Sequence, residues 1–99
     1  MKKNNTVVTR TSKELAEALG LTPADAVEWE VRIKITNKII STVQNNGMTV
    51  TEIAKEAGTS RARVTNILKG NTFGISLDVL FRVLGAVGEE VKISFKKAA

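Results

Sequence analysis

The sequence predicts a mainly α-helical fold of five helices that ends in a short β-strand. Three observations support this prediction. Several segments carry apolar residues at helical spacing, begin at a capping residue and end at a glycine. The last segment instead alternates apolar and polar residues, which is typical of a strand. The 99 residues have 42% hydrophobic content, enough for one small core, so we expect one domain over residues 12–99 after a flexible basic tail over residues 1–11.

The composition excludes several classes of protein. The chain has no cysteine and no histidine, which rules out disulfides, thiolate nucleophiles, imidazole catalysis and the usual zinc ligands. Its carboxylate, serine and lysine side chains gather at no recognisable catalytic spacing. We therefore expect no enzyme activity, no metal and no cofactor. The net charge of +5 fits a nucleic-acid partner, although basic chains also bind acidic proteins and membrane surfaces.

The sequence carries no membrane signal. No apolar run approaches the roughly 18 residues that a bilayer-spanning helix needs. The N-terminal stretch MKKNNTVVTR lacks the apolar region of a secretory signal peptide. We expect a cytoplasmic protein without a membrane partner.

The first expected helix follows the basic tail. The first ten residues are either disordered or a short edge strand, because only Val7 and Val8 can be buried there. Ser12 can then cap the segment KELAEALG, whose apolar residues share one helical face, and Gly20 ends it.

The second expected helix starts at Pro23 and carries conflicting signals. Thr22 as N-cap, Pro23 at the first position and Asp25 in the first turn predict a helix. Residues 27–35, VEWEVRIKI, alternate apolar and charged residues as a half-buried strand would. A strand would have to run into the helically spaced TNKIISTV without any turn between them. We therefore favour one long helix from Pro23 to about Gln44.

This long helix would be apolar on two flanks. Val27, Val31, Ile35, Ile39 and Val43 form one flank, and Trp29, Ile33 and Ile40 form the other. A single chain of this size has little protein to cover both, so the flank of Trp29 and Ile33 predicts a dimer interface. The alternative is that the first helix folds back and covers this flank.

The stretch 49–70 predicts two short helices joined by a tight turn. Thr49 and Glu52 have the spacing of a capping box at the start of VTEIAKEA, and Gly58 can take the positive φ that ends this helix. Ser60 can cap the second helix, RARVTNILK, before Gly70. Two helices that cross steeply need a small residue at the crossing and apolar residues facing back. Ala54, Val64 and Ile67 stand at these positions.

The second of these helices would expose polar and basic side chains. Arg61, Ala62, Arg63, Thr65 and Asn66 point outward and can contact base edges or phosphates. Residues 57–77 contain no acidic residue, whereas Arg61, Arg63 and Lys69 add three positive charges. A polyanion could dock on this face.

The last helix and the terminal strand follow a short loop, NTFGI. Ser76 caps LDVLFRVLGAVG, whose Leu77, Leu80, Phe81, Leu84 and Val87 we expect in the core, and Gly88 ends the helix. In the tail EEVKISFKKAA, Val91, Ile93 and Phe95 alternate with polar residues and predict a strand. A lone strand is not stable, so its partner is either residues 6–10 or the same strand of a second copy.

Residues 48–70 resemble the DNA-binding helix-turn-helix of the xenobiotic-response-element (XRE) family, which includes the lambda-type phage repressors. The resemblance lies in MTV, IAKEAGTS and RVTNILKG, although Val50 stands where relatives often carry a phosphate-contacting glutamine. It implies a lambda repressor-like domain that binds double-stranded DNA. The exposed face and the resemblance together give ten expected DNA contacts: Thr49, Thr51, Thr59, Ser60, Arg61, Ala62, Arg63, Thr65, Asn66 and Lys69.

Over residues 12–96 the chain is similar to a compact XRE subgroup that includes HigA-type antitoxins. This similarity implies a homodimeric repressor of a palindromic operator, and possible neutralisation of a partner toxin. The expected dimer interface comprises Trp29, Ile33, Val91, Ile93 and Phe95. Three functions therefore stay open: a transcriptional regulator, an antitoxin that also binds a toxin protein, and a helical dimerisation module that binds no DNA.

Overall fold

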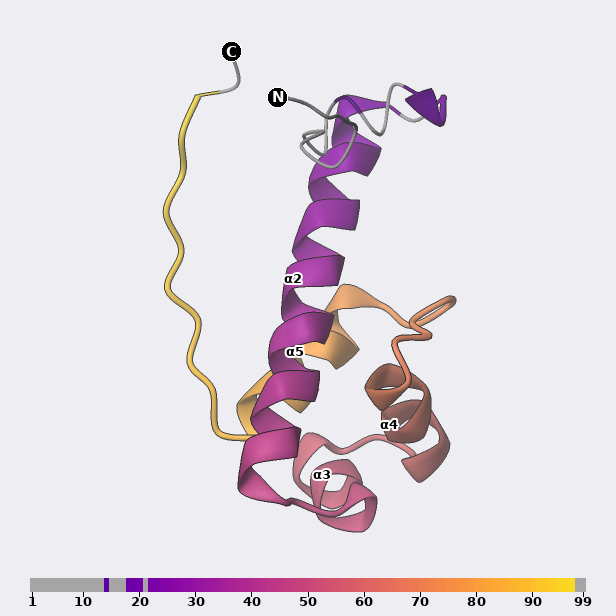
Figure 1. Ribbon diagram of the computed structural model, residues 1–99, viewed down its shortest axis with the longest axis vertical. Coiled ribbons are helices and arrows are strands. Elements are labelled where there is room, and N and C mark those ends of the chain that lie inside the picture. Colours follow the sequence, from indigo (N-terminus) through magenta and orange to yellow (C-terminus); the bar gives the residue numbers. More distant parts are fainter. Residues whose placement is uncertain (1–13, 15–17, 21, 98–99) are drawn as a thin grey trace, which may run out of the picture. The chain divides into compact units, whose positions relative to one another are not determined.

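The computed structural model describes residue 14, residues 18–20 and residues 22–97. The described residues form four helices (Figure 1), which are α2 (Pro23–Asn46), α3 (Val50–Ala57), α4 (Arg61–Leu68) and α5 (Leu77–Ala86). The chain divides into two compact units, residues 1–34 and residues 35–99, and α2 contributes to both. The expected tail boundary at residue 11 and most of the first expected helix lie outside the described residues. That residues 12–99 form one domain remains a prediction.

Helix α2 confirms the helical interpretation of residues 27–35. At its start the Asp25 amide donates to the Thr22 hydroxyl at 3.1 Å, and the Thr22 amide donates to the Asp25 carboxylate at 3.0 Å. The backbone bond from Thr22 is the main reason that the pKa of Asp25 lies below its ordinary value. The charges that suggested a strand instead pair along the helix, Glu28 with Arg32 at 3.4 Å and Glu30 with Lys34 at 3.2 Å. An alternating sequence can therefore form a helix, because its charges recur four residues apart.

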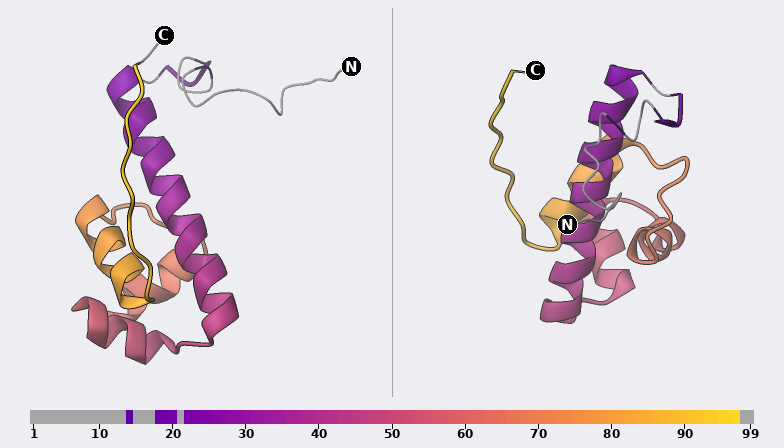
Figure 2. Two further views of the ribbon diagram at one scale, coloured as in Figure 1. Left: turned by 90° about the vertical axis from the view of Figure 1, so that its left-hand side faces the viewer. Right: turned by 45° about the horizontal axis from the view of Figure 1, so that its top comes forward.

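The core of the second unit lies where α3 packs against both α4 and α5. Figure 2 shows these three helices grouped around the C-terminal end of α2. The buried apolar side chains of this unit are Ile35, Ile39, Ile53, Ala54, Ala57, Val64, Ile67, Ile75, Val79, Leu80, Val83, Leu84 and Val87. Each short helix contributes two or more of them, so packing rather than length holds these helices in place.

The buried face of α5 agrees with the expected one only in part, since Leu80, Leu84 and Val87 are buried as expected. Val79 and Val83 are buried, whereas Phe81 is 41% exposed and Leu77 is only partly buried. The segment is apolar around most of its circumference, so periodicity alone does not determine which side faces inward. The buried side is that of Val79, Leu80, Val83 and Leu84, and α5 packs against α3.

The expected C-terminal strand does not form within residues 22–97. Residues 89–97 continue as chain without helix or strand, and residues 91–97 are exposed. A strand is defined by its hydrogen-bonded neighbour, and no backbone hydrogen bond joins residues 90–97 to another described residue. The other candidate partner, residues 6–10, lies outside the described residues.

Among the helices described here, none has the length and apolar character needed to span a membrane.

Candidate nucleic-acid interface

A complete capping box fixes the start of α3. The Glu52 amide donates to the Thr49 hydroxyl at 3.1 Å, and the Thr49 amide donates to the Glu52 carboxylate at 2.9 Å. This second bond is the main reason that the pKa of Glu52 lies below its ordinary value. The box satisfies two amides that have no partner within the helix, so α3 begins at Val50 as expected.

The turn between α3 and α4 depends on Gly58, whose φ is 68°. This left-handed conformation lets the amides of Gly58 and Thr59 donate to the carbonyls of Lys55 and Ala54, at 3.3 and 3.0 Å. The Ser60 hydroxyl then caps α4 by accepting a hydrogen bond from the Arg63 amide at 3.1 Å. Hydrogen bonds thus define both sides of the turn, and they fix the point at which α4 leaves it.

The buried residues of α4 determine which side chains face outward. Val64 and Ile67 are fully buried and define the inner side of the helix. At about 100° per residue, Ala62 and Asn66 lie opposite these two side chains, and Thr65 lies nearby. Arg61 and Arg63 flank this outer face, about 160° apart. The exposed face of α4 therefore has a polar centre with a basic side chain on each flank.

The structure places most of the ten expected contacts at the surface. Exposed residues are Thr49, Thr51, Ser60, Arg61, Ala62, Arg63, Asn66 and Lys69, and partly buried residues are Thr59 and Thr65. Three hydroxyls are in positions that were not expected of a DNA contact. The Thr49 and Ser60 hydroxyls each accept a capping hydrogen bond, from the amides of Glu52 and Arg63, and the Thr59 hydroxyl is buried, with no hydrogen-bond partner among the described residues. The structure thus brings together the exposed residues of α4 and its C-terminal Lys69 more clearly than the threonines of α3 and the turn.

The exposed face of α4 carries no negative charge. The nearest acidic residues along the chain are Glu56, in α3, and Asp78, in α5. The Asp78 carboxylate accepts a hydrogen bond from the Ser76 hydroxyl, which lowers the pKa of Asp78, and it pairs with Arg82 at 3.8 Å. Because α4 itself contains no Asp or Glu, its basic side chains have no acidic partner on their own helix.

Phe73 is a surface residue that sequence periodicity did not identify. Its side chain is 97% exposed in the loop between α4 and α5, which Figure 1 shows on the side of the domain that carries α4. The loop is held by a bond from the Ile75 amide to the Thr72 carbonyl at 3.0 Å and by a positive φ of 77° at Gly74. The only signal in the sequence is an aromatic residue before a loop glycine. We add Phe73 to the candidate interface.

The expected dimer residues all have accessible side chains. Trp29 is partly buried and Ile33 is 37% exposed. Val91, Ile93 and Phe95 are 50%, 67% and 94% exposed. Their exposure in one chain is compatible with an interface, which remains a prediction.

Comparison with known proteins agrees with this geometry. A family model described as a helix-turn-helix domain matches residues 16–96, and no curated protein and no solved structure matches the chain. The match covers α2 to α5 and most of the extended segment, including the whole α3–turn–α4 unit. It supports an XRE-like assignment and indicates a DNA-binding regulator, while the HigA-type subgroup is finer than the match. The chain belongs to the helix-turn-helix domain family.

Proposed function

We propose that this protein is a sequence-specific DNA-binding regulator that inserts α4 into the major groove. The observation that carries this proposal is the exposed face of α4, which is polar, free of acidic residues and flanked by Arg61 and Arg63. An α-helix fits the major groove, where each base pair presents a distinct pattern of donors and acceptors. The buried Val64 and Ile67 hold α4 against the core, so its outer face is presented in one orientation.

The side chains on this face match the chemistry of base edges. Asn66 can donate to and accept from adenine, and the Ala62 methyl group can contact the methyl group of thymine. Arg61 lies at the helix start, where a recognition helix meets the bases first, and we assign it a bidentate contact with guanine. Arg63 lies on the opposite flank and is assigned to a phosphate, as is Lys69.

We further propose that the protein acts as a homodimeric repressor. The similarity to the compact XRE subgroup that includes HigA-type antitoxins implies a twofold dimer, which would present two copies of α4. Two recognition helices of such a dimer lie about 34 Å apart, one turn of the duplex, so the operator should be an inverted repeat. The exposed Ile33, Val91, Ile93 and Phe95 provide apolar surface for the second copy.

An antitoxin role is the alternative that the HigA-type resemblance implies. In that case the protein would bind a partner toxin in addition to DNA. Co-expression with the adjacent open reading frame tests it, because an antitoxin forms a stable complex with that product and suppresses its toxicity. DNA binding without any such complex favours a regulator alone.

Selection from a pool of randomised duplexes tests the proposed function. Purified protein should enrich a defined motif, and the motif should read as an inverted repeat with half-sites about one helical turn apart. The affinity should fall as salt rises, because cationic side chains displace counterions from phosphates. Failure to enrich any motif would refute sequence-specific binding, and enrichment of a direct repeat would refute the twofold dimer.

A further inference from the structure

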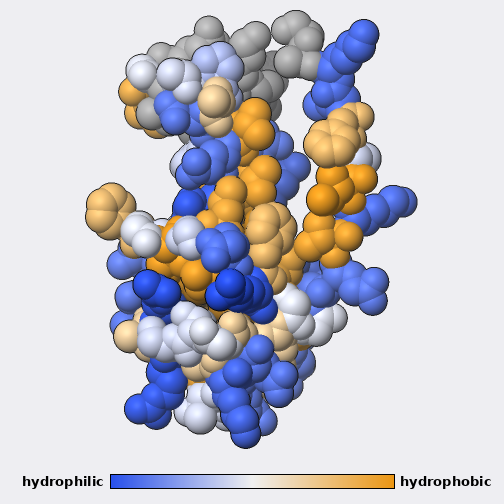
Figure 3. Space-filling view, turned by 180° about the vertical axis from the view of Figure 1, so that it is seen from behind, coloured by the Kyte–Doolittle hydropathy of each residue, from blue (hydrophilic) through white to orange (hydrophobic). Residues whose placement is uncertain are grey.

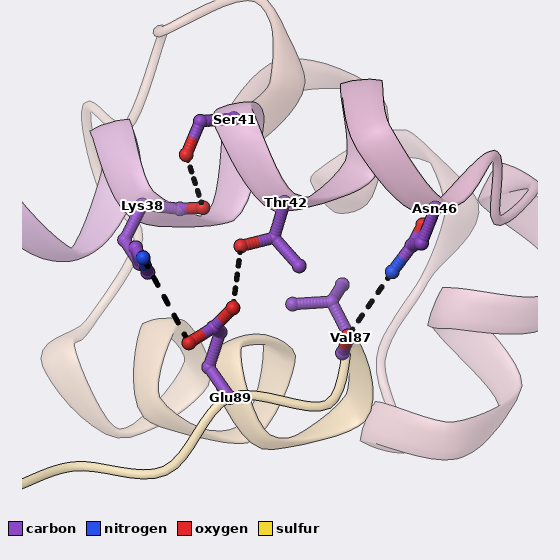
Figure 4. Close-up of polar contacts among 6 residues, drawn as sticks. All are labelled: Lys38, Ser41, Thr42, Asn46, Val87 and Glu89. Atoms are coloured by element: carbon purple, nitrogen blue, oxygen red, sulfur yellow. Dashed lines mark hydrogen bonds and ion pairs between the residues drawn. The ribbon is translucent and has the colours of Figure 1, made fainter.

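The start of the C-terminal segment, residues 89–97, is fixed against α2 (Figure 4). The Asn46 side-chain amide donates to the Val87 carbonyl at 3.1 Å, and the Thr42 hydroxyl donates to the Glu89 carboxylate at 2.8 Å. Lys38 adds an ion pair to Glu89 at 4.0 Å. Gly88, with a φ of 98°, turns the chain away from α5 at this point. The segment therefore leaves a defined anchor rather than a frayed helix end.

Beyond this anchor the segment exposes both apolar side chains and backbone. Val91, Ile93 and Phe95 are at least half exposed, and Figure 3 shows hydrophobic and hydrophilic side chains alternating along the segment. No backbone amide of residues 91–97 donates to any described residue. An extended segment with period-two alternation and free backbone groups can pair with another strand.

The sequence of this segment is complementary to itself in one antiparallel register. With Ile93 opposite Ile93 of a second copy, Val91 lies opposite Phe95, Lys92 opposite Ser94, and Glu90 opposite Lys96. All apolar residues then share one face of the ribbon, and the outer pair is attractive. Such cross-strand pairs are the contacts that stabilise a sheet.

The neighbouring registers either place like charges opposite each other or place apolar side chains opposite polar ones. A shift by two residues in one direction puts Lys92 opposite Lys92, and in the other direction puts Lys92 opposite Lys96. Like charges directly opposite each other destabilise a strand pair. A shift by one residue places apolar side chains opposite polar ones and reverses the faces. Among these registers, only the one centred on Ile93 avoids both faults.

We propose that residues 90–96 form a two-stranded antiparallel sheet with the same segment of a second copy, centred on Ile93. This inference deepens the proposed function, since it specifies how the twofold dimer forms, but it makes no use of DNA. A two-stranded ribbon is only marginally stable by itself, so the pairing is tested in the full chain.

Single cysteines test the register, because the natural chain has no cysteine. Opposite residues of antiparallel strands have Cα atoms about 4.5 to 5.5 Å apart, within the range that a disulfide spans. Ile93→Cys should therefore cross-link to itself under mild oxidation without DNA. Lys92→Cys and Ser94→Cys should each stay uncross-linked alone and should cross-link when the two variants are mixed.

The pattern of cross-links shows whether the two strands pair in the register centred on Ile93. Self-cross-linking of Lys92→Cys or Ser94→Cys, absence of the Ile93→Cys cross-link, or a monomer at all concentrations would overturn it. As a second variant, Ile93→Asp should raise the dimer dissociation constant at least about tenfold in sedimentation, with unchanged helicity, because it places two carboxylates opposite each other. An unchanged dissociation constant would also overturn the inference.

The cross-linking experiment and the duplex-binding experiment test the strand pairing and the proposed function independently. If the cross-links form as expected but no duplex is bound, the strand pairing stands and the DNA-binding proposal is refuted. If an inverted-repeat motif is selected but the cross-links do not form, the DNA-binding proposal stands and the strand pairing is refuted. A different surface then forms the dimer.

Discussion

Alanine in place of Gly58 should destabilise the protein, whereas alanine in place of Gly85 should stabilise it. Gly58 has a φ of 68° in the turn between α3 and α4, and Gly85 lies within α5. A Cβ atom at either position would have no heavy atom within 4 Å, so neither substitution causes a clash. The two variants therefore differ only in the backbone conformation that alanine must adopt.

The expected magnitudes follow from that conformation. Alanine in the left-handed region costs about 1 to 2 kcal/mol, which Gly58→Ala should lose from the free energy of unfolding. Alanine inside a helix is about 0.5 to 1 kcal/mol better than glycine, which Gly85→Ala should gain. In a domain of this size each kcal/mol corresponds to about 4 to 8 °C in the melting temperature.

Thermal and urea unfolding of both variants measure these effects. Circular dichroism should show a lower melting temperature for Gly58→Ala and a higher one for Gly85→Ala, relative to the natural chain. Equal stability of Gly58→Ala and the natural chain would show that the turn does not require a left-handed residue. A loss of stability in Gly85→Ala would show that α5 packs more closely at this position than the structure indicates.

Two further predictions concern the capping box and the dimer. The pKa of Glu52 is lowered in the folded chain, so the ionised Glu52 carboxylate adds to the free energy of unfolding above its ordinary pKa. This contribution is lost as the pH falls through the lowered pKa. Relative to Glu52→Gln, the natural chain should be more stable at about pH 7, and the difference should shrink as the pH falls below the ordinary carboxyl pKa; a difference independent of pH would contradict this. For the expected interface, Trp29→Ala should weaken dimerisation by on the order of 2 kcal/mol, about thirtyfold. If sedimentation shows a dimer at nanomolar concentration and only the melting temperature falls, Trp29 belongs to the core.

Local signals in the sequence predicted the helix-turn-helix closely. Thr49, Glu52, Gly58 and Ser60 act within three to five residues, so their hydrogen bonds follow from spacing alone. The helix over residues 27–35 also followed, since a strand there had no turn to separate it from the next helical segment.

Features that depend on distant contacts could not be predicted in this way. The inner side of α5 depends on how the helix packs in the fold, so Phe81 is exposed although its spacing suggested the core. The Thr59 hydroxyl is buried by the fold around the turn, and Phe73 is exposed by the geometry of its loop. A terminal strand needs a partner strand, and the pattern of Val91, Ile93 and Phe95 does not place one among the described residues of the same chain.

Comparison of Arg61→Ala with Arg63→Ala tests most directly whether α4 reads DNA. Binding of both variants to the selected duplex and to a scrambled duplex is measured across a salt series, after confirming unchanged helicity. Arg61→Ala should lose about 1 to 3 kcal/mol on the selected duplex and relax discrimination at one base pair. Arg63→Ala should weaken binding to both duplexes alike and lower the salt slope by about one. If neither variant changes its affinity for either duplex, α4 does not face the DNA, and the assignment of this protein as a DNA reader through α4 is contradicted.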